Sequence, residues 1–598
     1  MGKRTIPAPA NHSVSLWEKV VILLLLIFML LRPIIDGIAY PSFNHFWNSL
    51  FLLITALFFV QRFRGKEISI SMASGTFLLF LLTVCVSALF SQVPYLAVER
   101  ISSLLAIFAL LTLSSELFGS HQWKFLIMTI VAGVLVIVPY TIHQSFWGFA
   151  QLRAMVAANP DLMAMLPPSY LDRLASNRAF ATLVYPNILA GYLLLVYPIL
   201  FFGIYSKDIG LRIFFALLTS GAIWGLWLTG SYGGVIICVA ISVGMLLYCI
   251  LPEKLFPPIL SLTFLCGILL IIGTLYLHIL PKMSSLTDRF HYWNSALSIF
   301  RKYPLVGSGP ATFAFAYPQY KIAGAMEAKF AHNILVEILS ETGIIGFSAL
   351  LLFLGLSLTE IWKKLLSSRS FLTAGFAFSL IAVGLHSCID FDYADPSISG
   401  IAFILLGTFF TTEKRPAIRL TKISAGAMIL VLCAGIAVEQ GRAKTERILT
   451  YALQKQNQRI SASAITAVRF LPDAELYGIR GSIFWKKYLA YGEKSDAAKA
   501  IQEYKKASRL NPLSVKYHRT LALIYYRLGD MPSAEIYFSR VLALYPVKKL
   551  YNYEMALFYR ETGRPELAEH YFKLSEQMPG VTTEEQLTLE EYQHGKTF

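Results

Sequence analysis

Charged side chains are scarce in this chain of 598 residues. Asp, Glu, Lys and Arg make up 15% of the sequence and hydrophobic residues 56%, whereas soluble proteins carry about 25% charged residues. The charges are concentrated beyond about residue 440, where Lys, Arg and Glu recur every few positions. The scarcity excludes an ordinary soluble protein. The rise in charged residues near position 440 predicts a polytopic membrane domain over 1–440 and a water-exposed domain over 441–598.

Cysteine is rare as well, and its placement argues against a disulfide framework. The six cysteines lie within or at the edges of apolar runs, and none belongs to a CxxC pair. We interpret them as small residues that face lipid or neighbouring helices.

Long apolar runs, by contrast, are abundant. A membrane-spanning helix needs about 20 mostly apolar residues. The first run is followed by Arg32 and Pro33 and lacks a small-residue cleavage site, so we expect a span there rather than a cleaved signal peptide. The predicted fold is all-α, a membrane bundle of about 12–13 spans. The thirteen candidate runs lie near 18–35, 46–60, 72–90, 101–118, 125–142, 184–204, 211–229, 233–251, 257–280, 334–358, 370–388, 397–412 and 422–439.

Lysine and arginine in the short loops indicate the orientation of the bundle. They gather in alternate loops, whereas the short loops near 36–45, 230–232 and 389–396 contain none. Because cytoplasmic loops carry the excess of Lys and Arg, we predict a cytoplasmic N-terminus. Two long loops, 143–183 and 281–333, and the C-terminal domain are then on the outer face. The net charge of +16 is partly this loop excess, so it requires no nucleic-acid partner.

The C-terminal region contains a repeat with the 34-residue period of tetratricopeptide helix–turn–helix units. Such units stack into an α-solenoid with a concave face, which predicts a docking platform for a partner protein, such as one of the envelope, or for an extended ligand. The alternative is a cap that stabilises the membrane domain. A more degenerate unit is expected near 443–472. The repeat is carried by Ala522/Ala556, Gly529/Gly563, Ala534/Ala568, Tyr504/Phe538/Phe572 and Pro512/Pro546/Pro579.

The second long loop holds the most distinctive residues. Arg289, Trp293 and Ala296 lead into PLVGSG at 304–309, and His332 and Asn333 stand at the start of the next apolar run. This pattern resembles the O-antigen ligase and polymerase superfamily, whose loop reads R…W..A…PL.G.G, then HN and E.G..G. The resemblance keeps the order and spacing of every element over about 55 residues.

Three further segments agree with this resemblance, which covers roughly residues 170–400. Arg178 followed by PNILAGY at 186–192 is similar to the family's arginine and N-x-L-A helix start. LTGSYGG at 228–234 is similar to a T-x-S-R-G segment, with Tyr232 where an arginine is usual. HSCIDFD at 386–392 resembles an H-S-x-x-D-F motif of members that carry tetratricopeptide repeats.

The resemblance implies a GT-C-like enzyme of the bacterial inner membrane. Such enzymes move a glycan from an undecaprenyl diphosphate carrier to an acceptor hydroxyl on the periplasmic face. A diphosphate leaving group develops negative charge, and the planar fork of arginine suits phosphate oxygens. We therefore expect Arg289 and Arg178 to hold the diphosphate and His332 to take the acceptor proton. No cofactor is implied. Because no DxD-type pair is adjacent to either arginine in the sequence, we predict a metal-independent transferase. The leading hypothesis is that the enzyme inverts the anomeric configuration.

Five residues are candidates for supporting roles, each with an ordinary structural alternative. Glu327 either orients the histidine or is a solvated carboxylate. Asp390 and Asp392 either contact the acceptor or form a structural turn. Tyr317 and Tyr320 either stack on sugar rings or belong to the aromatic belt of the membrane interface.

Three acceptors are open at this stage: lipid A core (ligase), a growing glycan (polymerase) and a protein side chain (O-oligosaccharyltransferase). The attached repeats favour the first two. A transporter for lipid-linked sugars predicts charges near the membrane midplane and discontinuous helices, whereas the charges here cluster at the outer face. A non-catalytic membrane scaffold leaves the loop from Arg289 to His332 without a purpose.

Overall fold

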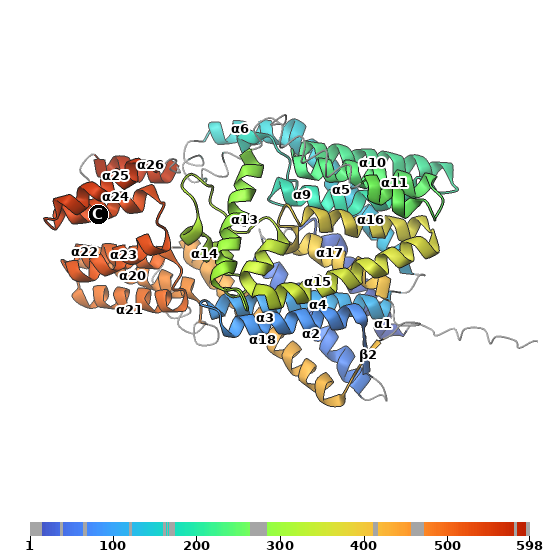
Figure 1. Cartoon of the computed structure of the whole chain (residues 1–598), viewed down its shortest axis with the longest axis horizontal. Coiled ribbons are helices and arrows are strands. Elements are labelled where there is room, and N and C mark those ends of the chain that lie inside the picture. Colours follow the sequence, from blue (N-terminus) through green and yellow to red (C-terminus); the bar gives the residue numbers. More distant parts are fainter. Residues whose placement is uncertain are drawn as a thin grey trace, which may run out of the picture.

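The computed structural model describes residues 15–35, 40–63, 68–118, 122–159, 163, 166, 171, 174–263, 284–410, 417–455, 472–578 and 583–593. Figure 1 shows a bundle of long helices joined to a group of shorter C-terminal helices. The described residues contain two strands, β1 (Ile68–Ser71) and β2 (Ala417–Leu420), which pair antiparallel. Every other described element is a helix, so the predicted all-α fold is confirmed.

Nine described helices are long and apolar enough to cross a membrane. Three shorter ones, α1 (Leu16–Leu31), α16 (Phe371–His386) and α17 (Pro396–Gly407), coincide with further predicted runs. The remaining run, 257–280, falls largely outside the described residues. The nine are α2 (Pro41–Phe63), α3 (Met72–Leu89), α4 (Pro94–Leu117), α5 (Trp123–His143), which continues through η2 (Gln144–Gly148) into α6 (Phe149–Ala157), α9 (Pro186–Gly203), α10 (Ile209–Leu228), α11 (Tyr232–Ile250), α15 (Ile334–Ser368) and α18 (Lys422–Lys455).

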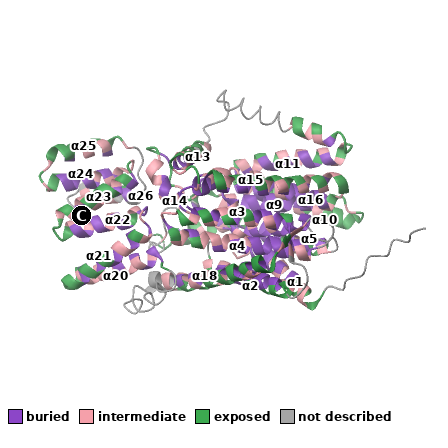
Figure 2. Cartoon of the chain, turned by 60° about the horizontal axis from the view of Figure 1, so that its bottom comes forward, coloured by how far each residue is buried: buried purple, intermediate pink, exposed green. Residues whose placement is uncertain are grey.

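The apolar core runs through the middle of this bundle, where Figure 2 shows the buried residues concentrated. Helix α9 is the most enclosed of the nine, with 78% of its apolar window buried. Because it is surrounded by other helices, α9 gives the bundle a fixed central element, and its first turn reaches the site described below.

The basic loops lie together at one end of the bundle. Lys364, near the end of α15, donates to the carbonyl of Thr408 after α17, and Arg369 donates to the carbonyl of Leu251 after α11. The first turns of α9, α15 and α17 lie at the other end, with α13 (Ser284–Lys302) and α14 (Phe313–Tyr320). The alternation of basic and uncharged loops thus corresponds to the two ends of one bundle. Which end faces the cytoplasm stays a prediction from the charge rule.

The C-terminal helices form three antiparallel pairs, of which the second and third begin 34 residues apart. The pairs are α20 (Ala474–Tyr491) with α21 (Lys494–Leu510), α22 (Val515–Arg527) with α23 (Met531–Leu544), and α24 (Lys549–Glu561) with α25 (Pro565–Glu576). Gly529 and Gly563 turn the chain within the last two pairs at φ +79° and +74°, a conformation that favours glycine. Helix α26 (Thr583–Gln593) follows. Helix α18 crosses the predicted boundary at 440, and the unit expected near 443–472 lies partly outside the described residues.

Candidate functional site

Asp390 is the centre of a buried polar cluster at the end of the bundle away from the basic loops. It lies in the turn between α16 and α17, and its side chain is 1% exposed. Its Oδ2 accepts hydrogen bonds from Arg289 Nη2 at 2.8 Å and from Asn187 Nδ2 at 2.6 Å. Its Oδ1 lies 3.2 Å from His332 Nδ1. Segments that are far apart in the sequence, at α9, α13 and the start of α15, therefore meet at one carboxylate.

Arg178 joins this cluster through Asn187. Its Nη2 donates to Asn187 Oδ1 at 2.7 Å, and its Nε donates to the carbonyl of Thr229, after α10, at 2.8 Å. Burial lowers the pKa of Arg178, the charge of Asp390 raises it, and the nearby charge of Arg289 lowers it. Arginine stays protonated in proteins despite such shifts. The two predicted diphosphate ligands and the predicted base thus lie around one acidic residue.

The electrostatics keep Asp390 ionised. Burial alone raises the pKa of a carboxyl, but His332, His386 and Arg289 outweigh it and hold the pKa of Asp390 well below its usual range. Asp392 differs, because burial raises its pKa to about 6 although His386 Nδ1 lies 2.5 Å from its Oδ2. His386 and Asp392 thus form a second buried pair next to Asp390.

A glycine in α9 leaves space for the Asp392 side chain of this pair. A Cβ atom built on Gly191 would lie 2.5 Å from Asp392 Oδ1, far inside van der Waals contact. Gly191 therefore allows the 387–395 turn to approach α9 closely enough for Asn187 to reach Asp390.

His332 has a left-handed backbone, with φ +53°, a conformation that costs a residue other than glycine about 1 kcal/mol. The neighbouring residues fix it on both sides. The backbone N–H of Ala331 donates to Glu337 Oε2 at 2.7 Å. Asn333 caps α15, its Oδ1 accepting from the N–H groups of Leu335 and Val336. Strain of this kind clusters at functional sites.

Two aromatic rings hold the imidazole. The ring of Tyr292 stacks on His332 with centroids 5.6 Å apart, and Phe391 meets it edge-on at 4.9 Å. The His332 side chain is 22% exposed. With Nδ1 beside Asp390, Nε2 is the ring nitrogen left for a substrate.

The glycines of the PLVGSG segment allow it to pack against α15. Gly307 has φ +75°, and a Cβ there would lie 2.1 Å from the carbonyl carbon of Glu341. The α15 backbone breaks at Gly343, with φ +65°. The Glu341 carboxylate accepts from the N–H groups of Ala311 and Phe313 at 2.9 and 3.0 Å. These contacts fix the loop beside the first turns of α15.

The structure places the other three predicted residues away from this cluster. Glu327 lies near Lys321 and Lys548, with Nζ atoms 3.0 Å from its Oε1. The Tyr317 ring is buried, and its hydroxyl donates to the carbonyl of Met326 at 2.7 Å. The carbonyl of Tyr320 accepts from Ser295 in α13. The sugar-stacking role of the two tyrosines stays a prediction.

Sequence reasoning did not single out Asn187 and Tyr292 as site residues. Asn187 was part of a recognised motif, but its bridge between Arg178 and Asp390 requires the fold. Tyr292 had a signal in the sequence, because it follows Arg289 by three residues and so shares its helix face.

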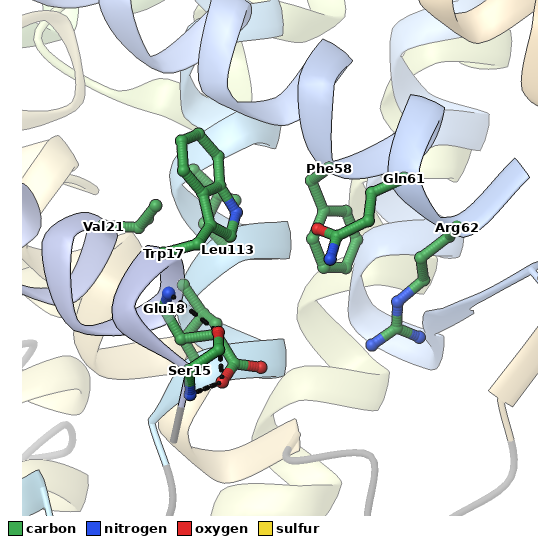
Figure 3. A pocket seen from close by; sticks show the side chains of 9 residues that line it. Ser15, Trp17, Glu18, Val21, Phe58, Gln61, Arg62 and Leu113 are labelled. Atoms are coloured by element: carbon green, nitrogen blue, oxygen red, sulfur yellow. Dashed lines mark hydrogen bonds between the residues drawn. The ribbon is translucent and has the colours of Figure 1, made fainter. Parts of the chain in front are cut away.

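A small cavity among the described helices lies elsewhere. It measures about 140 Å³ and is lined by α1, α2 and α4, among them Trp17, Glu18 and Arg62 (Figure 3). Helix α1 begins there, and just after its end the backbone carbonyl of Arg32 accepts a hydrogen bond from the hydroxyl of Ser397 at the start of α17. Since 16 residues of helix rise about 24 Å, the cavity and the Asp390 cluster lie at opposite ends of the bundle.

Comparisons with known proteins bear on the membrane part of the chain. No curated protein matches the chain. A solved structure titled MamA AMB-1 is similar to it at 20% identity over 28% of this chain and 90% of that one, with a TM-score of 0.19. The family model described as O-Antigen ligase matches residues 214–351, which include Arg289 and His332 but not Arg178 or Asp390. The chain therefore carries a segment that is similar to the O-antigen ligase family, and this segment extends from α10 into α15.

Proposed function

We propose that the protein transfers a glycan from undecaprenyl diphosphate to an acceptor hydroxyl in the assembly of a surface polysaccharide. The observation that carries the proposal is the meeting of Arg178, Arg289 and His332 around Asp390. The O-antigen ligase match supports the same reaction class. The bacterial inner membrane, with the site on its periplasmic side, is part of the proposal.

In the proposed step the acceptor oxygen attacks the anomeric carbon of the carrier-linked sugar. The bond from that carbon to the diphosphate oxygen breaks, and the diphosphate leaves with the electron pair on its lipid. His332 Nε2 takes the proton of the acceptor hydroxyl. Attack opposite the leaving group inverts the anomeric configuration.

Arg178 and Arg289 stabilise the leaving diphosphate. Two guanidinium groups beside each other and one carboxylate leave a net positive charge, which matches the charge that develops on the phosphate oxygens. The bonds of Arg178 to Asn187 and to Thr229 fix its plane before substrate arrives. A preorganised donor loses less conformational entropy on binding.

Asp390 is proposed to orient His332 and to stabilise the imidazolium that forms. A carboxylate beside Nδ1 favours the tautomer with its proton on that nitrogen, so that Nε2 is a free base. The low pKa of Asp390 keeps it ionised throughout. Because these steps use the side chains alone, we propose that transfer needs no metal.

The acceptor class is open between a lipid-linked core glycan, a growing glycan and a protein hydroxyl. The experiment is a transfer assay with purified protein, undecaprenyl diphosphate glycan and each acceptor in turn, in the presence and absence of EDTA. Wild-type protein should release the carrier with one acceptor. His332→Ala should be slower by roughly 10²- to 10⁴-fold.

Matched controls separate the possible failures. His143→Ala, at the end of α5, removes a histidine that is stacked on Tyr140 outside the cluster and should leave the rate unchanged. Undiminished transfer by His332→Ala would eliminate the proposed base. Carrier that stays intact with every acceptor would favour a transporter or a scaffold.

A further inference from the structure

The repeat domain packs against the loop that carries the candidate site. Helix α23 contacts α14, and Leu544, the last residue of α23, lies in one buried apolar cluster with Phe313 and Tyr317 of α14. Leu513, between α21 and α22, belongs to the same cluster. The repeat domain thus supplies part of the apolar core beneath the loop.

A polar network borders this apolar contact. The hydroxyl of Tyr545 donates to Glu327, and Lys321 Nζ donates to the Tyr545 oxygen at 2.6 Å. Lys548 Nζ lies 3.0 Å from Glu327 and 2.9 Å from Glu585 of α26. Loop, repeat and C-terminal helix therefore meet at Glu327.

The apolar cluster continues to the candidate base. The Tyr317 ring meets that of Tyr292 edge-on at 5.7 Å, and Tyr292 stacks on His332 at 5.6 Å. Ala331, whose N–H is bonded to Glu337, belongs to the same cluster. An unbroken series of packed side chains therefore connects Leu544 of the repeat domain to His332.

We propose that the docked repeat domain positions His332, with Leu544 and Tyr545 holding α14 against α13 and Tyr292 fixing the imidazole. Leu544, Tyr545 and Tyr292 are positioning residues that act through His332. The expected effect on the transfer rate rests on the proposed function, whereas the ordering of the loop around His332 by the repeat domain does not.

A second anchor keeps the domain attached when this contact is weakened. Arg442, in the second half of α18, lies 2.9 Å from Glu99 of α4 and 2.5 Å from Asp473, before α20. Variants at Leu544 should therefore loosen the loop without releasing the repeat domain. A misplacement of about 1 Å is enough to slow a reaction roughly 100-fold.

The test compares Leu544→Ala with Leu557→Ala in the full-length chain. Leu557 is buried within the repeat domain on α24. Leu557→Ala therefore removes the same atoms as Leu544→Ala, but away from the contact with α14. Tyr545→Phe, which removes one hydroxyl, is a milder second variant, and Tyr559→Phe, whose hydroxyl bonds to Glu535 inside the repeats, is its control.

Three quantities are measured for each variant: hydrogen exchange of peptides covering 329–335, undecaprenyl diphosphate bound per chain, and the transfer rate per bound carrier. Leu544→Ala should speed exchange about tenfold and slow transfer about tenfold, with carrier stoichiometry unchanged. Tyr545→Phe should change both in the same direction by about threefold. The two control residues belong to the apolar cluster inside the repeat domain and not to the one shared with the loop, so exchange at 329–335 and transfer should stay within about twofold of wild type.

Unchanged exchange at 329–335 in both Leu544→Ala and Tyr545→Phe would overturn the proposal. So would equal rate losses from Leu544→Ala in wild type and in Tyr292→Leu, because a residue that acts through Tyr292 should have less effect once that ring is gone. If wild-type protein transfers nothing, the proposed function fails, and the exchange data still decide whether the repeat domain orders the loop.

Discussion

Asp390 and Glu327 are two acidic residues with similar partners and different surroundings. Each contacts at least one basic side chain and one polar ring, which is His332 for Asp390 and Tyr545 for Glu327. The Asp390 side chain is 1% exposed, however, and that of Glu327 is 48% exposed. Charges interact more strongly where water is excluded, whereas exposed ion pairs contribute about 0–1 kcal/mol. We therefore expect the proposed chemistry to depend on the buried Asp390 cluster, and the proposed docking on the exposed network around Glu327.

The largest effect is expected from Asp390→Asn. The amide keeps the shape of the carboxylate but removes the charge that pairs with Arg289 and orients His332. We expect transfer to fall by roughly 100-fold or more, with carrier binding reduced far less. The measurement is the rate per bound carrier. Transfer at more than half the wild-type rate would remove Asp390 from the mechanism.

Replacement of the arginines should have the next largest effect. Arg289→Lys and Arg178→Lys keep the positive charge but lose the planar fork, so each should weaken binding of undecaprenyl diphosphate about tenfold. Arg301→Lys, at the end of α13, is the matched control and should not change the affinity. An equal loss in all three variants would indicate a diffuse charge effect rather than two specific ligands.

A small effect is expected from Glu327→Gln, because it changes an exposed network. We expect transfer to fall at most about fivefold. The ratio of the Asp390→Asn loss to the Glu327→Gln loss measures the contrast between the two centres directly. A greater loss at Glu327 than at Asp390 would reverse the assignment.

The smallest effect concerns pH. Burial raises the pKa of Glu327, but the Tyr545 hydroxyl, Lys321 and Lys548 together hold it below the usual 4.5. A depressed acid pKa stabilises docking above the unfolded value and loses that contribution as pH falls through the folded value. As the pH is lowered beyond 4.5, the thermal midpoint of the wild-type protein should therefore decrease more steeply than that of Glu327→Gln. Identical curves would contradict this role.

The sequence predicted the helices well because apolar runs of membrane length have few alternatives. It also singled out Arg178, Arg289 and His332 as candidate site residues and Asp390 as a possible supporting one, since each stands in a recognisable segment. Their meeting could not be predicted, because 212 positions separate Arg178 from Asp390 and the bridge depends on how α9, α13 and α16 pack. Glu327 was close to the histidine in sequence, but the 321–331 segment turns it toward Lys548, which only the fold reveals.

The structure of the protein with undecaprenyl diphosphate bound, determined in a lipid nanodisc, tests the central claim most directly. The account predicts that the diphosphate lies within hydrogen-bond distance of both Arg178 and Arg289, on the side of His332 that presents Nε2. A diphosphate bound at the basic loops near Arg62 and Arg369, at the other end of the bundle, would contradict it.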